Sequence, residues 1–160
     1  MRTLANQDLA PEELVRRLNN VLHGNTAPQM FATFFFASMD VENGRLNYVN
    51  AGHNYPILCG NGRLEYLSKG GLVLGVRPDE IYVGGEVHLA SGEIVALYSD
   101  GITEATDKNN LEFGEERLLS LLQYCHQESA DGILMNVLRD VENFCGTPQD
   151  DLTLLVIKRV

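Results

Sequence analysis

The chain has 160 residues, of which 44% are hydrophobic and 21% charged, values typical of one soluble globular domain with a real core. Its 22 acidic and 12 basic residues leave a formal net charge of -10, which argues against binding to nucleic acid or to anionic lipid. No apolar run approaches the roughly 20 residues of a bilayer span, and the N-terminus lacks a secretory signal pattern, so we expect a cytoplasmic location.

The hydrophobic pattern first predicts an amphipathic helix over residues 11–23, with Pro11 in its first turn. Strand-like segments follow in pairs, each pair around a turn signal such as Asn43-Gly44. The predicted hairpins join residues 31–39 with 45–49, residues 55–59 with 63–67, and residues 86–89 with 93–99.

The spacing of the hydrophobic residues changes in the last third of the chain. Residues 94–98 (IVALY) form a nearly continuous apolar run, which predicts a strand in the middle of a sheet. Helices are predicted within residues 114–125 and 133–141, and a buried strand over residues 152–157 (LTLLVI) closes the chain. Strands first, then helices and one closing strand indicate an α+β fold.

Two acidic positions flank buried strands. Asp100 follows the apolar run and precedes Gly101, whereas Asp150 and Asp151 precede the closing strand. If the two strands are neighbours, these carboxylates can converge on one point, and a cluster of carboxylates usually requires a cation. Asp-Gly is also a common turn dipeptide, so spacing alone leaves a phosphatase, a nuclease and an ordinary turn open.

Five short motifs in this order resemble the PPM, or type 2C, metal-dependent protein phosphatases, and specifically their bacterial SpoIIE-type branch. The two acidic ones are SDGITEA (residues 99–105) and QDDLTL (149–154). The others are NAGHNYP (50–56), LGV (74–76) and FGEERL (113–118).

The resemblance implies a PPM-type β-sandwich flanked by helices, in α/β/β/α layers. It also implies that residues 1–160 form a single SpoIIE-type phosphatase domain that lacks the family's N-terminal strands, with Met1–Ala5 beginning inside a helix. The family's bridging aspartate motif is missing, so only part of the metal site is expected here. We therefore expect weak Mn²⁺ binding, low activity for this chain alone, and a possible homodimer through an uncovered sheet edge.

The implied activity is metal-dependent hydrolysis of phosphoserine or phosphothreonine on a regulatory protein, such as an anti-sigma-factor antagonist. The family uses two Mn²⁺ or Mg²⁺ ions bridged by a water, without a covalent enzyme intermediate. The alternative is a catalytically incomplete fragment or pseudophosphatase that acts as a protein-interaction or regulatory module.

By the same resemblance, Asp100 and Asp150 are the catalytic metal ligands, Asp151 supports the site, and Gly101 lets the chain pass close to the metal. His53 has two open interpretations, a general acid or a residue that shapes a turn. Glu104 is expected to charge the start of a helix.

The three cysteines are Cys59, Cys125 and Cys145. They form no CxxC pair, and we expect all three to be buried free thiols.

Overall fold

The computed structural model describes residues 9–27 and 29–160, so the helix expected at Met1–Ala5 lies outside the described residues. The chain forms two compact units. The first comprises the chain up to His53 together with Leu67–His88, and the second comprises Asn54–Tyr66 and Leu89–Val160. The described residues of the first unit combine a β-sheet with one helix and those of the second combine a β-sheet with three, which confirms the predicted α+β class.

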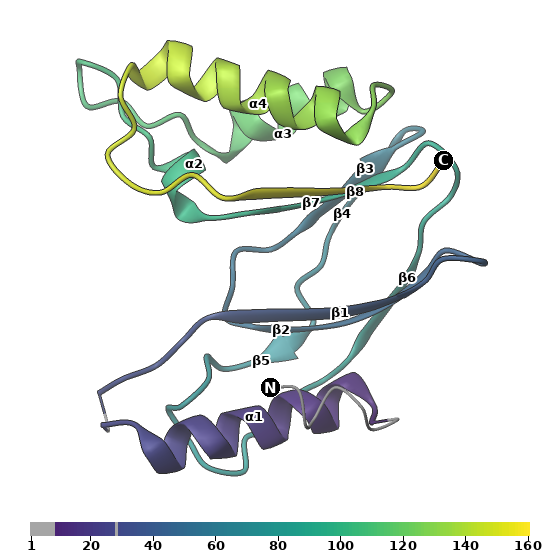
Figure 1. Cartoon of the computed structure of the whole chain (residues 1–160), viewed down its shortest axis with the longest axis vertical. Helices are drawn as coiled ribbons and strands as arrows, with labels where there is room; N and C mark the ends of the chain where they lie inside the picture. Colours follow the sequence, from purple (N-terminus) through teal and green to yellow (C-terminus); the bar gives the residue numbers. More distant parts are fainter. Residues whose placement is uncertain (1–8, 28) are drawn as a thin grey trace. The chain divides into compact units, whose positions relative to one another are not determined.

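In the first unit, strand β2 is the centre of the sheet. It pairs antiparallel with β1 and β6 and parallel with the short β5. The elements are α1 (Pro11–Asn25), β1 (Phe34–Asp40), β2 (Arg45–Ala51), β5 (Gly70–Gly71) and β6 (Gly85–His88). Helix α1 packs its apolar side against the sheet, with Val15 fully buried in one cluster with Val49 and Ala51 of β2 (Figure 1). Burying a side chain such as Val15 stabilises the unit by about 1.5–3 kcal/mol.

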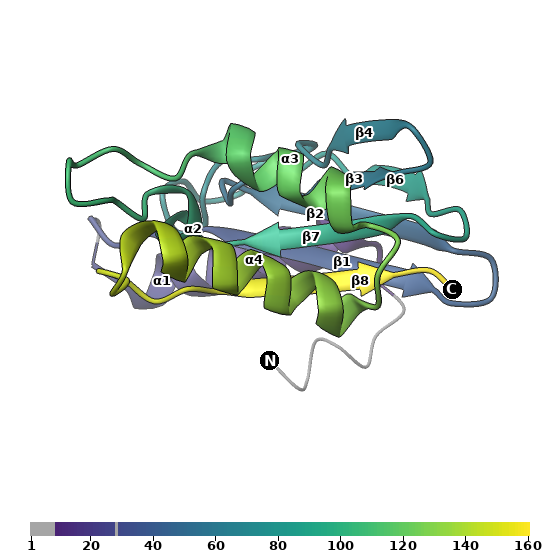
Figure 2. The same ribbon diagram turned by 90° about the horizontal axis from the view of Figure 1, so that it is seen from above.

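The second unit is an antiparallel sheet with strand order β4-β3-β7-β8. Its strands are β3 (Ile57–Gly60), β4 (Arg63–Tyr66), β7 (Ile94–Tyr98) and β8 (Leu154–Lys158). Its helices are α2 (Asp100–Thr103), α3 (Glu115–Cys125) and α4 (Ala130–Cys145). Figure 2 shows α3 and α4 lying along one face of this sheet, where their apolar residues join those of β3 and β7 in the core.

Two of the three predicted hairpins are confirmed. Strands β1 and β2 pair around Asn43-Gly44, and β3 and β4 pair around Asn61-Gly62, where both turn residues have positive φ. The predicted central position of β7 is also confirmed, because it pairs with β3 on one side and β8 on the other.

The third predicted hairpin, residues 86–89 with 93–99, is wrong. The local turn does form, since the Glu93 N–H donates to the Ala90 carbonyl at 3.0 Å and the Glu93 carboxylate accepts the Ala90 N–H at 2.8 Å. The flanking strands nevertheless belong to different sheets, β6 with β2 and β7 with β3 and β8. Both strands thus pair with strands that are more distant in the sequence, and not with each other as the turn signal suggested.

Among the residues that the structure describes, no helix has the length and apolar character needed to cross a membrane.

Candidate metal centre at the ends of β7 and β8

The end of β7 lies beside the start of β8. The two strands are antiparallel and their register places Tyr98 opposite Leu154. Asp100 follows β7 directly after Ser99, and Asp150 and Asp151 precede β8. The sequence predicts that the acidic segments can meet if these two strands are neighbours. They are neighbours, so the two segments lie at the same end of the strand pair.

The Ser99 hydroxyl group joins the two segments. Its Oγ accepts a hydrogen bond from the Thr153 N–H at 3.0 Å and donates one to the Asp151 carbonyl at 3.2 Å. The Ser99 N–H also donates to the Thr153 carbonyl at 3.0 Å. The chain that carries Asp150 is thus held against the turn that carries Asp100.

Gly101 is buried against the segment that carries Asp150 and Asp151. A Cβ atom at this position would lie 2.5 Å from the Asp151 carbonyl oxygen, closer than real Cβ contacts allow. Positive φ is not the reason for this glycine, because Gly101 is absent from the described glycines that have positive φ. The glycine is needed for space.

A pocket of about 270 Å³ opens at this junction, lined by Gly101, Glu104, Ala105, Gln149 and Asp150. The Gln149 amide Nε2 donates to the Thr106 hydroxyl at 3.1 Å, which holds the acidic segment at its other end. Glu104 does not start a helix as predicted. It follows the last residue of α2, its N–H donates to the Asp100 carbonyl at 2.8 Å, and it lines the pocket together with Asp150.

Both predicted ligand residues are exposed, and each has one carboxylate oxygen held by the next peptide group. Asp100 Oδ1 accepts the Gly101 N–H at 3.0 Å, and Asp150 Oδ1 accepts the Asp151 N–H at 2.7 Å. Carboxylate oxygens suit hard cations such as Mg²⁺ and Mn²⁺. Within residues 9–27 and 29–160, no group of three or more His, Cys, Asp or Glu side chains is arranged to hold a metal. The donors present therefore fit part of a coordination sphere for such an ion.

The two less certain site residues have backbone roles. The Asp151 side chain is exposed, and its carbonyl oxygen is the atom that meets Ser99 and Gly101. The His53 N–H donates to Asn50 Oδ1 at 2.8 Å, and the buried Asn50 amide donates to the Leu67 carbonyl at 3.3 Å. These bonds support the turn-shaping interpretation of His53 within the first unit. The general-acid interpretation stays a prediction.

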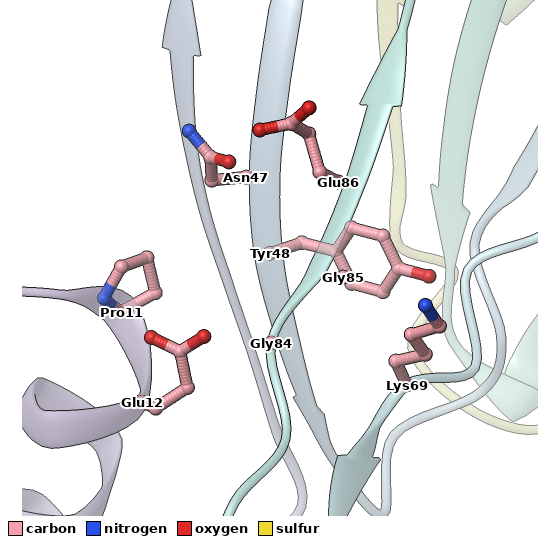
Figure 3. Close-up of a pocket in the computed structure, with 8 residues that line it drawn as sticks. All are labelled: Pro11, Glu12, Asn47, Tyr48, Lys69, Gly84, Gly85 and Glu86. Atoms are coloured by element: carbon pink, nitrogen blue, oxygen red, sulfur yellow. The ribbon is translucent and has the colours of Figure 1, made fainter.

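A second pocket, of about 500 Å³, lies in the first unit between α1 and strands β2 and β6. Figure 3 shows its lining, with the Lys69 ammonium group beside the Tyr48 hydroxyl group and the Glu12 and Glu86 carboxylates on other sides. An ammonium group in the lining repels a divalent cation, so this pocket is less suited to a metal than the junction in the second unit.

The sequence reasoning missed Ser99, Gln149 and the pocket position of Glu104. All three lie inside the motifs SDGITEA and QDDLTL, directly beside or near an aspartate. A polar side chain next to a ligand residue is a signal for a supporting role, but its partner cannot be known before the strands are paired.

Comparison with protein-family models matches the whole chain, residues 1–160, to stage II sporulation protein E, SpoIIE. The chain belongs to the SpoIIE family. This confirms the resemblance drawn from the five motifs.

The SpoIIE-family chain is 30% identical over 165 residues to phosphoserine phosphatase RsbU of Bacillus subtilis, covering 99% of this chain and 48% of RsbU. It is 32% identical over 141 residues to protein IcfG of Synechocystis sp., covering 86% of this chain and 22% of IcfG. The chain thus spans half or less of the length of these curated relatives.

Solved structures show the fold. The SiaA-PP2C domain of Pseudomonas aeruginosa matches with a TM-score of 0.81 at 16% identity, covering 96% of this chain and 63% of that domain. The SpoIIE phosphatase domain of B. subtilis, presoaked with manganese, matches with a TM-score of 0.64 at 15% identity, covering 99% of this chain and 70% of that domain. RsbX in complex with magnesium matches with a TM-score of 0.66 at 17% identity, covering 97% of this chain and 66% of that one. The chain therefore has the fold of PP2C phosphatase domains.

Proposed function

We propose that this SpoIIE-family chain is part of a metal-dependent protein phosphatase. The enzyme would hydrolyse phosphoserine or phosphothreonine on a regulatory protein, such as an anti-sigma-factor antagonist. Family membership and the similarity to phosphoserine phosphatase RsbU support the reaction class. The cytoplasmic location and self-association belong to the same proposal and stay predictions.

The observation that carries the proposal is the junction of the two acidic segments. Asp100 and Asp150 come from chain segments far apart in sequence. The Ser99 hydroxyl group bonds these segments to each other, and the missing side chain of Gly101 leaves room for their close contact. An ordinary pair of turns would not require a glycine under the carbonyl of the other segment. Carboxylates that a fold brings close together repel each other unless a cation lies between them, so a cation site shared by the two segments would suit this junction.

In this proposal, Asp100 and Asp150 hold Mn²⁺ or Mg²⁺ through carboxylate oxygens. When bound, such ions act as Lewis acids toward a phosphoryl group. The chain itself supplies the orientation of both carboxylates, through the hydrogen bonds to the next peptide N–H groups. Glu104 adds negative charge to the pocket beside Asp150, which favours a cation there.

The test compares the unaltered chain with Asp100→Asn and Asp150→Asn, by calorimetric titration with Mn²⁺ and by Mn²⁺-dependent hydrolysis of a phosphoserine peptide. We expect weak binding and slow hydrolysis by the unaltered chain. Loss of a residue that hydrogen-bonds to a metal ligand lowers metal affinity or activity by about 10- to 100-fold. Loss of the ligand itself should therefore lower both by at least about 100-fold.

Asp140→Asn is the matched control, because it makes the same carboxylate-to-amide change on the exposed side of α4. It should leave binding and hydrolysis unchanged. Equal Mn²⁺ binding by the unaltered chain and both site variants would refute the assignment of the ligands.

A further inference from the structure

The segment that carries Asp150 lies outside the strand ladder. The β7–β8 pairing ends at Tyr98 and Leu154, and residues 149–153 are not part of a strand. A segment beyond the ladder is free to sample several positions unless other bonds hold it. Its position relative to Asp100 must therefore be set by bonds beyond the strand pairing.

Ser99 supplies two of these bonds with one side chain. A serine hydroxyl group has one proton to donate and lone pairs to accept, and Ser99 uses both functions on the acidic segment. Ser99 is also covalently joined to Asp100, and its hydrogen-bond acceptor is the carbonyl of Asp151, the residue after Asp150. The Ser99 hydroxyl group thus connects the segments that carry the two aspartates.

We propose that Ser99 is a positioning residue, whose hydroxyl group sets the separation of the Asp100 and Asp150 carboxylates and thereby the affinity of the site for Mn²⁺. The inference rests on the proposed function, because it assigns a role toward the same cation. It goes further by assigning a role to a residue outside the proposed pair of ligands, Asp100 and Asp150. Alanine offers neither bond, whereas threonine keeps a hydroxyl group at the same place.

The test measures Mn²⁺ affinity by calorimetry and thermal unfolding without metal for the unaltered chain, Ser99→Ala, Ser99→Thr and Ser120→Ala. Ser120→Ala is the matched control, because the Ser120 hydroxyl also donates to a carbonyl, that of Glu116 at 2.8 Å, but within α3. We expect Ser99→Ala to weaken Mn²⁺ binding by about 10- to 100-fold, the usual effect of losing a partner that orients a ligand. Ser99→Thr should recover most of the affinity, and Ser120→Ala should not change it.

Amide hydrogen exchange of the metal-free chain gives an independent readout. The Thr153 N–H bonds to the Ser99 hydroxyl, so it should exchange faster in Ser99→Ala, whereas N–H groups within β8 should keep their protection. An unchanged exchange rate at Thr153 would show that the hydrogen bond from the Thr153 N–H to the Ser99 hydroxyl does not hold the segment.

The outcomes separate the two proposals. If Ser99→Ala lowers the melting temperature but leaves Mn²⁺ affinity unchanged, Ser99 is only structural and the positioning role is wrong. If the unaltered chain binds no Mn²⁺ at all, the proposed metal site fails, and the positioning role toward the metal fails with it.

Discussion

Gly101 lies where one added methyl group would meet the backbone of a distant segment. It is buried, and the Asp151 carbonyl oxygen occupies the space that a side chain would need. Asp100, immediately before it, is exposed and has an oxygen bonded to the Gly101 N–H. One glycine therefore affects both the packing of the two segments and the orientation of a predicted ligand.

We expect Gly101→Ala to destabilise the second unit by about 1–3 kcal/mol, the usual cost of forcing extra volume into a packed site. Urea unfolding measures the effect. Gly24→Ala is the control, since no atom beyond the neighbouring residues and backbone of its own helix lies within 4 Å of its Cβ position. Gly24 is in α1, where alanine should be neutral or stabilise by up to about 1 kcal/mol. Equal stability of the two variants would contradict the steric role of Gly101.

Helix α1 shows how one turn of an element is stabilised by charge. The Glu13 carboxylate accepts hydrogen bonds from Arg16 Nε at 2.8 Å and from Arg17 Nε at 2.6 Å, at spacings of three and four residues. These residues share one face of the helix. The hydrogen bond from Arg16, followed by that from Arg17, lowers the pKa of Glu13 from 4.5 to about 2.

The stability of α1 should therefore depend on pH through Glu13. Because the pKa is lower in the folded state, the stabilisation is fully present above about pH 4.5 and is lost as the pH falls toward 2. We expect Glu13→Gln to be less stable than the unaltered chain at neutral pH, with the difference vanishing near pH 2 and shrinking in high salt. Urea unfolding followed by circular dichroism checks this.

Glu12→Gln is the control for that experiment. It removes a charge from the same turn, and Glu12 forms no ion pair with any residue that the structure describes. A stability difference for Glu13→Gln that stays constant from neutral pH to acid would show that the ion pairs contribute nothing.

The cysteines report on the folding of a whole unit. Cys59 and Cys125 are fully buried in the core of the second unit, and Cys145 is half-buried. Burial raises the pKa of Cys59 to about 11 and also raises the pKa of Cys125. The expectation of buried free thiols is thus confirmed for two of the three cysteines.

We expect a thiol reagent at neutral pH to label Cys145 first in the native chain, and Cys59 and Cys125 only when the unit unfolds. The thiolate is the reactive form, and a raised pKa together with burial keeps its population small. Mass spectrometry of the labelled peptides, with and without denaturant, measures the order. Rapid native labelling of Cys59 would contradict the packing of this core.

The sequence by itself determined the features that depend on neighbouring residues. Helix periodicity spans a few turns and a hairpin such as β3–β4 is set by two turn residues, so helices, two hairpins and the α+β class were predictable. The ordered motifs likewise identified the SpoIIE family, which the family match confirms.

Only the tertiary structure decided the features that join distant segments. Which strands pair decides the partners of β6 and β7. It also decides why position 101 has no room for a side chain and which segment the Ser99 hydroxyl group bonds. The Ser99 hydroxyl bonds residues 52 and 54 positions away, and no local pattern encodes such a partner. The acidic residues can therefore be found in the sequence, but what holds their two segments together follows from the packing of the whole unit.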